Sequence, residues 1–417
     1  MLFREMNIMK KTLAILLALV MLISCASAFA EGDQVKLTFQ RIGSDAAESA
    51  YWAWVIEEFE KANPGIDIEY DDAAIGADMD TKLNTLFAAG TGPDLIGHGI
   101  LSVAGRVEQG HYLPVDEYFA GWAGKDNLME SVLMNGTYKG QTYGIGYSTT
   151  PFVFAYRKDV LEAANLPVPT TWEELASAAR ALTEKNEKGE ITFSGFCFPS
   201  AGGNLVELDV FVYGNGGAYM DEQSNPIMTG EEKVEAINFL EELLPDVNIA
   251  YSASDTNPFV KGQAAMTLIN NVALTSMMAA GSEYEGKVGI ALPPNNGTKA
   301  TFSGCNMLFI GRDCADTDAA WKFIEFAMSE ESTLKRAEMC NIPVTLSSLS
   351  DEFIAMDPWN AVRIECVENG IGMPRATWST SFQTIRNELV QNVLFGDMDA
   401  ETALSEAQDT LEFEMDY

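Results

Sequence analysis

Apolar residues recur along most of the chain with two alternating periods. Residues 35–39 and 66–70 place an apolar residue at every second position, which predicts strands with one buried face. Between them, apolar residues follow helical spacing from Trp52 to Phe59, and a Pro-Gly turn at residues 63–65 ends that helix. Because strand and helix patterns continue to alternate, we expect parallel sheets flanked by helices.

Helix starts carry local signals of their own. Three pairs of residues have the spacing of a capping box, in which two side chains bond to the free N–H groups of a helix start. These pairs are Asp45 with Glu48, Thr171 with Glu174, and Thr229 with Glu232. The pattern further predicts helices over 79–87, 320–328 and 399–411, and strands at 95–96, 264–269, 288–292 and 306–310.

Residues 1–30 are typical of an export signal, with basic residues followed by a short apolar run. Ala28-Phe29-Ala30 predicts a cleavage site that leaves Glu31 as the first residue. Residues 22–25 also resemble the lipobox of bacterial lipoproteins, in which Cys25 would be lipidated. Both alternatives remain open, and we favour free release because no Gly/Ser tether follows Cys25. In either case the protein is expected to work outside the cytoplasmic membrane, in the periplasm or the extracellular space.

Charge and composition narrow the function classes. The chain has 61 Asp and Glu against 26 Lys and Arg, a formal charge of −35, so phosphate backbones and anionic membranes would repel it. Only two histidines are present, which argues against a multi-histidine metal site. No G-x-S-x-G elbow, Walker A loop or H-E-x-x-H motif occurs. We therefore expect no nucleic-acid partner, no cofactor and no catalytic residues.

The 417 residues are enough for two domains, yet no low-complexity linker or internal repeat divides them. Two domains would therefore be joined by more than one crossing of the chain. Segments 143–150, 292–304 and 341–343 are candidates, because each contains Gly or Pro, where the backbone can absorb a hinge rotation.

A series of short motifs along the mature chain resembles the extracellular solute-binding protein family 1, the sugar-binding component of ABC transporters. Each motif is weak by itself, whereas their order and spacing together are specific. The motifs are Glu58–Ile66 (EFEKANPGI), Lys82–Leu95 (ending AGTGPDL), Tyr138–Ile145 (YKGQTYGI), Tyr156–Leu161 (YRKDVL), Thr170–Leu175 (TTWEEL), Gly262–Met266 (GQAAM) and Ala320–Ile324 (AWKFI).

The resemblance implies an α/β, two-lobed periplasmic-binding-protein-like fold of type II, with a mostly parallel sheet in each lobe and a ligand cleft between the lobes. Residues 35–145 and 300–340 would form lobe 1, and residues 150–298 and 342–417 would form lobe 2. One departure concerns the strand after Gly262–Met266: many sugar binders continue it with Gly-Trp, whereas this chain has Asn270-Asn271. Polar contacts are therefore expected there in place of ring stacking.

Candidate ligand contacts follow from the chemistry of a sugar, which presents hydroxyls on its rim and C–H groups on its faces. A cleft for it needs polar side chains and flat aromatic rings, placed at the carboxyl ends of strands. Residues of these types that lie in loops next to predicted strand ends are Arg41, Ser44, Asp45, Asp94, His98, Tyr147, Asn215, Asn270, Asn306, Arg375 and Trp378.

Structural roles compete with ligand contact at several of these positions. Asp45 has the place of a helix cap, and Asp94 that of a turn residue after Pro93. Tyr147 suits hinge packing and Trp378 a core anchor as well as stacking on a sugar. Arg375, with Arg41, would receive a carboxylate if the substrate were a uronic acid.

Two functions of different classes are consistent with the sequence. The first is an extracytoplasmic receptor, expected to be a monomer, that captures a small carbohydrate by hinge closure and delivers it to the membrane permease of an ABC-type importer. The second is a secreted polysaccharide-active enzyme with a carboxylate pair. A variant of the first keeps the receptor fold but binds a non-sugar, such as an organic acid or a peptide.

Overall fold

A computed structural model of the chain describes residues 34–43, 45–74, 76–270, 274–278 and 281–415. The export signal, its cleavage site and Cys25 lie outside these ranges, as do the predicted contact Ser44 and Asn271.

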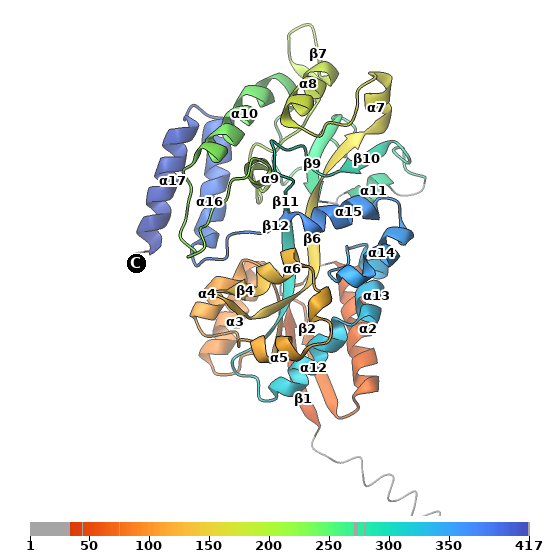
Figure 1. Cartoon of the computed structure of the whole chain (residues 1–417), viewed down its shortest axis with the longest axis vertical. Coiled ribbons are helices and arrows are strands. Elements are labelled where there is room, and N and C mark those ends of the chain that lie inside the picture. The colour runs from red at the N-terminus through yellow and green to blue at the C-terminus, as the bar shows by residue number, and fades with distance from the viewer. Residues whose placement is uncertain (1–33, 44, 75, 271–273, 279–280, 416–417) are drawn as a thin grey trace, which may run out of the picture.

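The first lobe, in the lower half of Figure 1, is built on three parallel strands, β1 (Val35–Arg41), β2 (Ile66–Asp71) and β3 (Leu95–Gly99). β1 lies between β2 and β3 and pairs with both of them. The helices around this sheet are α2 (Ala46–Ala62), α3 (Ala77–Ala88), α4 (Ser102–Glu108), α5 (Asp116–Gly121), α6 (Glu130–Leu133), α12 (Thr317–Ala327) and α13 (Glu330–Cys340).

Two long strands connect this lobe to the second. β6 (Gly144–Arg157) pairs antiparallel with β11 (Thr301–Ile310) over its first half and with β9 (Met266–Asn270) and β10 (Val288–Ala291) over its second half. β11 in turn pairs antiparallel with β3. Figure 1 shows β6 and β11 running from one lobe into the other. The predicted parallel pairing thus holds for the first three strands, whereas the strands shared by the lobes run antiparallel.

The second lobe, in the upper half of Figure 1, carries most of the remaining helices. They are α7 (Lys158–Ala163), α8 (Trp172–Leu182), α9 (Glu207–Gly214), α10 (Glu231–Val247), α11 (Thr275–Met278), α15 (Asn360–Glu368), α16 (Ser379–Leu389) and α17 (Ala400–Met415), with α14 (Ser350–Met356) leading into them. Short strands complete the chain: β4 (Thr137–Tyr138), β5 (Gln141–Thr142), β7 (Glu184–Lys185), β8 (Ile191–Phe193) and β12 (Gly370–Ile371).

The cap predictions have different outcomes. Asp45 accepts a hydrogen bond from the Glu48 N–H at 3.0 Å, but the Glu48 carboxylate pairs with Arg336 and does not complete the predicted box. Thr171 forms the complete predicted capping box. The prediction at Thr229 is wrong, because α10 begins at Glu231 with Gly230 in the cap position and no side-chain cap. Gly230 has φ 144°, a conformation that favours glycine, so the backbone itself ends the preceding turn.

Aromatic rings fill the core of the first lobe. Phe39 on β1 contacts Trp52 of α2 edge-on at 5.1 Å between ring centroids and Phe323 of α12 at 5.4 Å. Phe59 meets Phe323 from the other side at 5.1 Å. All four side chains are buried, so α2 and α12 pack against each other and against the same face of the central strand.

The third connection between the lobes follows α13. Asn341 takes the left-handed conformation with φ 52°, and Arg363 of α15 donates to its carbonyl oxygen and to its side chain. The next residues still pack on the first lobe, where the Met129 N–H donates to Thr345 O at 3.0 Å, so the chain enters the second lobe later than the predicted 341–343. α15 is therefore held to the connection by one buried guanidinium.

Candidate functional site

A cleft of about 730 Å³ lies between the two lobes. Its walls come from β3, α3 and α4 of the first lobe, from β6 and β11, and on the opposite side from the loop before α9 and from α16. Polar side chains on its walls include Asp80, Asn84, His98, Asn204, Asn306 and Gln383. A ligand in this cleft would contact both lobes.

The floor of the cleft is one face of the paired strands that connect the lobes. Ser148 and Thr150 of β6 line it, and so do Phe302, Gly304 and Asn306 of β11. Side chains two residues apart on a strand point to the same face, so both sets project toward the same side of the sheet. The floor therefore presents hydroxyl and amide groups beside one aromatic ring.

Arg106 organises the polar wall of the first lobe. Its guanidinium donates to Asp80 Oδ1 at 2.5 Å and to Asn84 Oδ1 at 3.0 Å. Asp80 and Asn84 are four residues apart on α3 and so share a face of that helix. Because the Asn84 oxygen is already used, its amide N–H groups are left to donate, while the half-exposed Asp80 carboxylate offers acceptor oxygens.

His98 extends this cluster from the end of β3. The Gly99 N–H donates to His98 Nδ1 at 2.8 Å, so the neutral ring carries its proton on Nε2. That nitrogen lies 3.4 Å from Asp80 Oδ1. The nearby His98 ring, and then the hydrogen bond from Arg106, lower the pKa of Asp80 to about 2, although partial burial acts in the opposite direction. Asp80 is therefore ionised under all physiological conditions.

The second lobe supplies a smaller polar wall. Asn204, in the loop before α9, is bonded through its side-chain oxygen to Arg386 of α16. Asn387 fixes the same loop by accepting from Leu205 N–H at 3.1 Å and donating to Gly203 O at 2.9 Å. α16 thus positions this loop and also contributes Gln383 directly to the cleft.

Chemically, the cleft is a hydrogen-bonding site. It combines an ionised carboxylate, several amides and hydroxyls and the ring of Phe302, a set that suits a ligand with many hydroxyls. Within the described ranges, no group of three or more His, Cys, Asp or Glu side chains is arranged to hold a metal ion. The cleft can therefore bind and orient a polar ligand with the side chains on its walls.

A smaller pocket of about 300 Å³ adjoins the cleft in the second lobe. It is lined by Phe152 of β6, Glu207 at the start of α9, Tyr251, Asn257 and Asn270 of β9, among others. The Phe152 ring meets the Phe302 ring of the cleft at 5.8 Å between centroids.

Three of the predicted contact residues are brought together by this geometry. His98 and Asn306 line the cleft, and Asn270 lines the smaller pocket. His98 lies near the end of β3, Asn306 in the middle of β11 and Asn270 at the end of β9. These parts of the three strands lie where the lobes join.

Other predicted residues of the first lobe lie outside both linings. Arg41 is buried and donates to Tyr70 Oη at 2.8 Å and to Asp72 at 3.1 Å. Asp45 caps α2, and Asp94 accepts from the Thr38 N–H and hydroxyl at the amino end of β3. Tyr147 is buried, with the ring of Trp52 and the guanidinium of Arg336 each 5.0 Å from the centre of its own ring.

In the second lobe, three predicted residues are outside both linings as well. Asn215 donates to Glu232 O at 2.8 Å and to Glu235 Oε2 at 2.9 Å. Trp378 is buried, and its Nε1–H donates to Ser224 O at 3.0 Å. Arg375 is half-buried in the loop before α16, where burial lowers its pKa.

The residues that define the polar wall, Asp80, Asn84 and Arg106, were not among those predicted from the sequence. The i, i+4 spacing of Asp80 and Asn84 beside the apolar stripe of α3 is a signal for a shared polar face. Arg106 lies on α4, which follows α3 after the intervening strand β3. Nothing in the sequence near Arg106 indicates that it contacts Asp80 and Asn84. The pairing arises only from the packing of α3 against α4.

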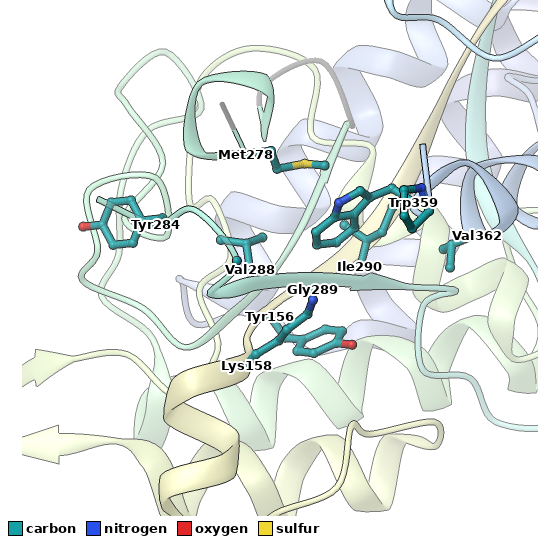
Figure 2. Close-up of a pocket in the computed structure, with 11 residues that line it drawn as sticks. Tyr156, Lys158, Met278, Tyr284, Val288, Gly289, Ile290, Trp359 and Val362 are labelled. Carbon is teal, nitrogen blue, oxygen red and sulfur yellow. The ribbon is translucent and has the colours of Figure 1, made fainter. Parts of the chain in front are cut away.

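A third pocket lies away from the cleft, on the second lobe. Figure 2 shows it between β10 and the start of α15, with Tyr156, Ile290 and Trp359 among its lining residues. The ammonium of Lys158 lies 4.8 Å from the centre of the Trp359 ring. Its volume is about 370 Å³ and its lining is mainly aromatic and aliphatic. It therefore suits a ligand with many hydroxyls less well than the cleft does.

Residues 54–362 match the family described as bacterial extracellular solute-binding protein. The maltotriose-binding protein of Pyrococcus abyssi is 23% identical over 369 residues, covering 82% of this chain and 75% of the relative. The mannitol-binding protein of Pseudomonas aeruginosa is 23% identical over 395 residues, covering 86% and 88%.

Solved structures share the fold. A solute-binding protein of an ABC transporter from Thermotoga lettingae, bound with α-D-tagatose, has a TM-score of 0.73 at 24% identity over 90% of this chain and 98% of that chain. A solute-binding protein from Agrobacterium radiobacter, in complex with ribitol, has a TM-score of 0.70 at 26% identity over 91% and 98%. The two-lobed architecture is thus common to this chain and to these proteins.

Proposed function

We propose that this chain, which belongs to the bacterial extracellular solute-binding protein family, captures a carbohydrate outside the cytoplasmic membrane and delivers it to the permease of an ABC-type importer. The relatives and the solved structures described above are binding proteins, and their names or structures associate them with maltotriose, mannitol, tagatose and ribitol. These ligands have in common a chain or ring densely substituted with hydroxyls.

The observation that carries the proposal is the polar cleft between the lobes. Asp80 offers charged acceptor oxygens, Asn84 offers amide donors, and Asn306 with Gln383 adds amides from two further directions. Each sugar hydroxyl both donates and accepts, so a wall that mixes acceptors and donors can satisfy it on desolvation. Phe302 supplies an apolar surface for the C–H groups.

Hinge closure explains how the permease could distinguish the ligand-bound protein from the free protein. We take the lobes to be residues 35–145 with 300–340 and residues 150–298 with 342–417, apart from the segment around Thr345, which pairs with Met129 of the first lobe. A ligand held by Asp80 on one side and Gln383 on the other favours the closed arrangement, because both contacts exist together only there. The shift in population is limited by the difference in ligand affinity between the two states.

The proposal also covers the oligomeric state of the protein, its location and its processing. The mature protein acts as a monomer in the periplasm or the extracellular space, and the permease docks on the closed form. Lipidation of Cys25 and cleavage after Ala30 remain the two routes to the mature form, and mass spectrometry of the exported protein distinguishes them.

The binding function is tested by titration calorimetry and thermal shift with a panel of neutral saccharides and polyols. Binding of one member at micromolar affinity, with a rise in melting temperature that follows ligand concentration, is the expected result. Failure of every member to bind would contradict the proposal. Chromatography of the same mixtures checks the alternative of a polysaccharide-active enzyme, for which the ligand would be consumed.

A further inference from the structure

The smaller pocket continues the floor of the cleft into the second lobe. Ser148 and Thr150 of β6 line the cleft, and Phe152, two residues further along the same strand face, lines the smaller pocket. The loop before α9 does the same on the opposite wall, because Asn204 lines the cleft and Glu207 the pocket. The two cavities therefore lie end to end along one surface.

Glu207 is the unusual group in this pocket. Its Oε2 is fully buried and has no hydrogen-bond partner among the described residues. The nearby guanidinium of Arg386 is already paired with Asp209 at 2.6 Å. One guanidinium thus faces two carboxyl groups, so an ionised Glu207 leaves one negative charge uncompensated.

The surroundings of Glu207 favour a positively charged ligand group. The aromatic side chains of Phe152 and Tyr251 line the pocket, and the carboxylate of Asp255 lies on its exposed side. None of the described lining residues is a lysine or an arginine. Aromatic faces and carboxylates both attract an ammonium group, and the nearby cation, Arg386, is already paired with Asp209.

We infer that this pocket is a subsite of the carbohydrate cleft that takes the protonated amino group of an amino sugar, with the Glu207 carboxylate as its acceptor. The inference rests on the proposed function and specifies the ligand class of the same site. A neutral hydroxyl would leave the buried charge in place when the lobes close, whereas an ammonium neutralises it. The strongly negative charge of the whole chain also attracts cationic sugars to the cleft.

The probes for the test are glucosamine and its β-1,4-linked dimer and trimer, with glucose, cellobiose, cellotriose and the N-acetylated forms as neutral counterparts. Titration calorimetry at pH 7 is carried out on the wild type, on Glu207→Gln and on the control Glu241→Gln, which changes an exposed glutamate on α10 of the same lobe. Circular dichroism establishes that each variant is folded.

We expect the wild type to bind at least one amino sugar tenfold or more tightly than its neutral counterparts. Glu207→Gln should abolish that preference and change the affinity for neutral sugars less than threefold, while Glu241→Gln keeps the preference. Equal affinities in the wild type, or a preference that survives in Glu207→Gln, would overturn the inference. If neutral sugars bind and amino sugars do not, this inference fails and the proposed function stands. If neither series nor the wider saccharide panel binds, both fail.

Discussion

The guanidinium of Arg386 on α16 donates to the carboxylate of Asp209 on α9 at 2.6 Å, and neither side chain is exposed to solvent. This pair joins the two helices that frame the second-lobe wall of the cleft. Arg386 also holds Asn204, so the same guanidinium fixes a residue of the cleft itself.

Replacing one member of this pair should be strongly destabilising. Arg386→Met leaves Asp209 buried without its partner, and we expect the free energy of unfolding to fall by about 3–5 kcal/mol. Denaturant unfolding measures the change. The matched control is Arg180→Met, since Arg180 makes its ion pairs at the surface, with 42% of its side chain exposed, and should lose at most about 1 kcal/mol. Equal losses in the two variants would contradict the assignment.

The ionised carboxylate of Asp80 is expected to be the strongest contact of the cleft. Asp80→Asn removes a charged acceptor, which is typically worth about 1.5–3 kcal/mol, so affinity for the sugar ligand should fall roughly 10- to 100-fold. Titration calorimetry with the bound member of the saccharide panel measures the loss. Asp78→Asn is the control, because Asp78 lies on the same helix, is exposed and does not line the cleft. An Asp80→Asn variant that binds as the wild type does would remove Asp80 from the site.

Local chemistry explains which parts of the fold were predictable. The helix starts at Asp45 and Thr171 depend on a cap side chain and a backbone N–H only three residues apart, so the sequence contains the whole interaction. The start near Thr229 was placed wrongly, because Gly230 replaced a side-chain cap with a backbone conformation. β11 begins at Thr301, five residues before the predicted strand, since the small polar residues Ser303 and Gly304 interrupt the apolar run.

Residues of the candidate site could be predicted only where their position relative to a strand places them in the cleft. His98 follows from the rule that ligands lie at the carboxyl ends of strands, whereas Asn306 lies in the middle of β11 and reaches the cleft because it pairs with Gly99 at the end of β3. Tyr147 has the residue type expected of a sugar contact but is packed against Arg336, which is 189 residues away in the sequence. The Arg106–Asp80 pair likewise depends on two helices coming together, and no spacing rule relates residues on different elements.

Burial of Glu207 gives a pH dependence of stability whose sign can be stated. Burial raises the pKa of Glu207 from 4.5 to about 7 in the folded protein, despite the nearby Arg386. Between these values the folded state holds a proton that the unfolded state has released, so this group makes the protein less stable as pH rises from 4.5 to 7. A difference of this size corresponds to about 3 kcal/mol at most.

Glu207→Gln removes the titration and should therefore stabilise the protein above pH 7. We expect its free energy of unfolding to exceed that of the wild type by about 1–3 kcal/mol at pH 8 and to match it below pH 4.5, where Glu207 is protonated in both states. Urea unfolding at both pH values measures the difference. A stabilisation that is the same at pH 4.5 and pH 8 would show that Glu207 does not titrate in this window.

Binding of an amino sugar should release a proton from Glu207. The charged groups that face this carboxyl are Arg386, which is paired with Asp209, and Asp255 at the rim, with Tyr251 and Cys197 nearby. At pH 6, below its pKa of about 7, Glu207 is mostly protonated, while the amino group of the ligand is charged. The carboxyl must ionise to accept the ammonium, so nearly one proton should leave for each ligand bound, and affinity should rise as the pH is increased from 5 to 7.

Calorimetry in buffers of different ionisation enthalpy counts these protons. The wild type should release nearly one proton with an amino sugar at pH 6 and close to none with the neutral counterpart, and Glu207→Gln should release none with either ligand. Because a purely structural role for Glu207 would not couple its proton to the charge of the ligand, equal proton release with both ligands would exclude it as the ammonium acceptor.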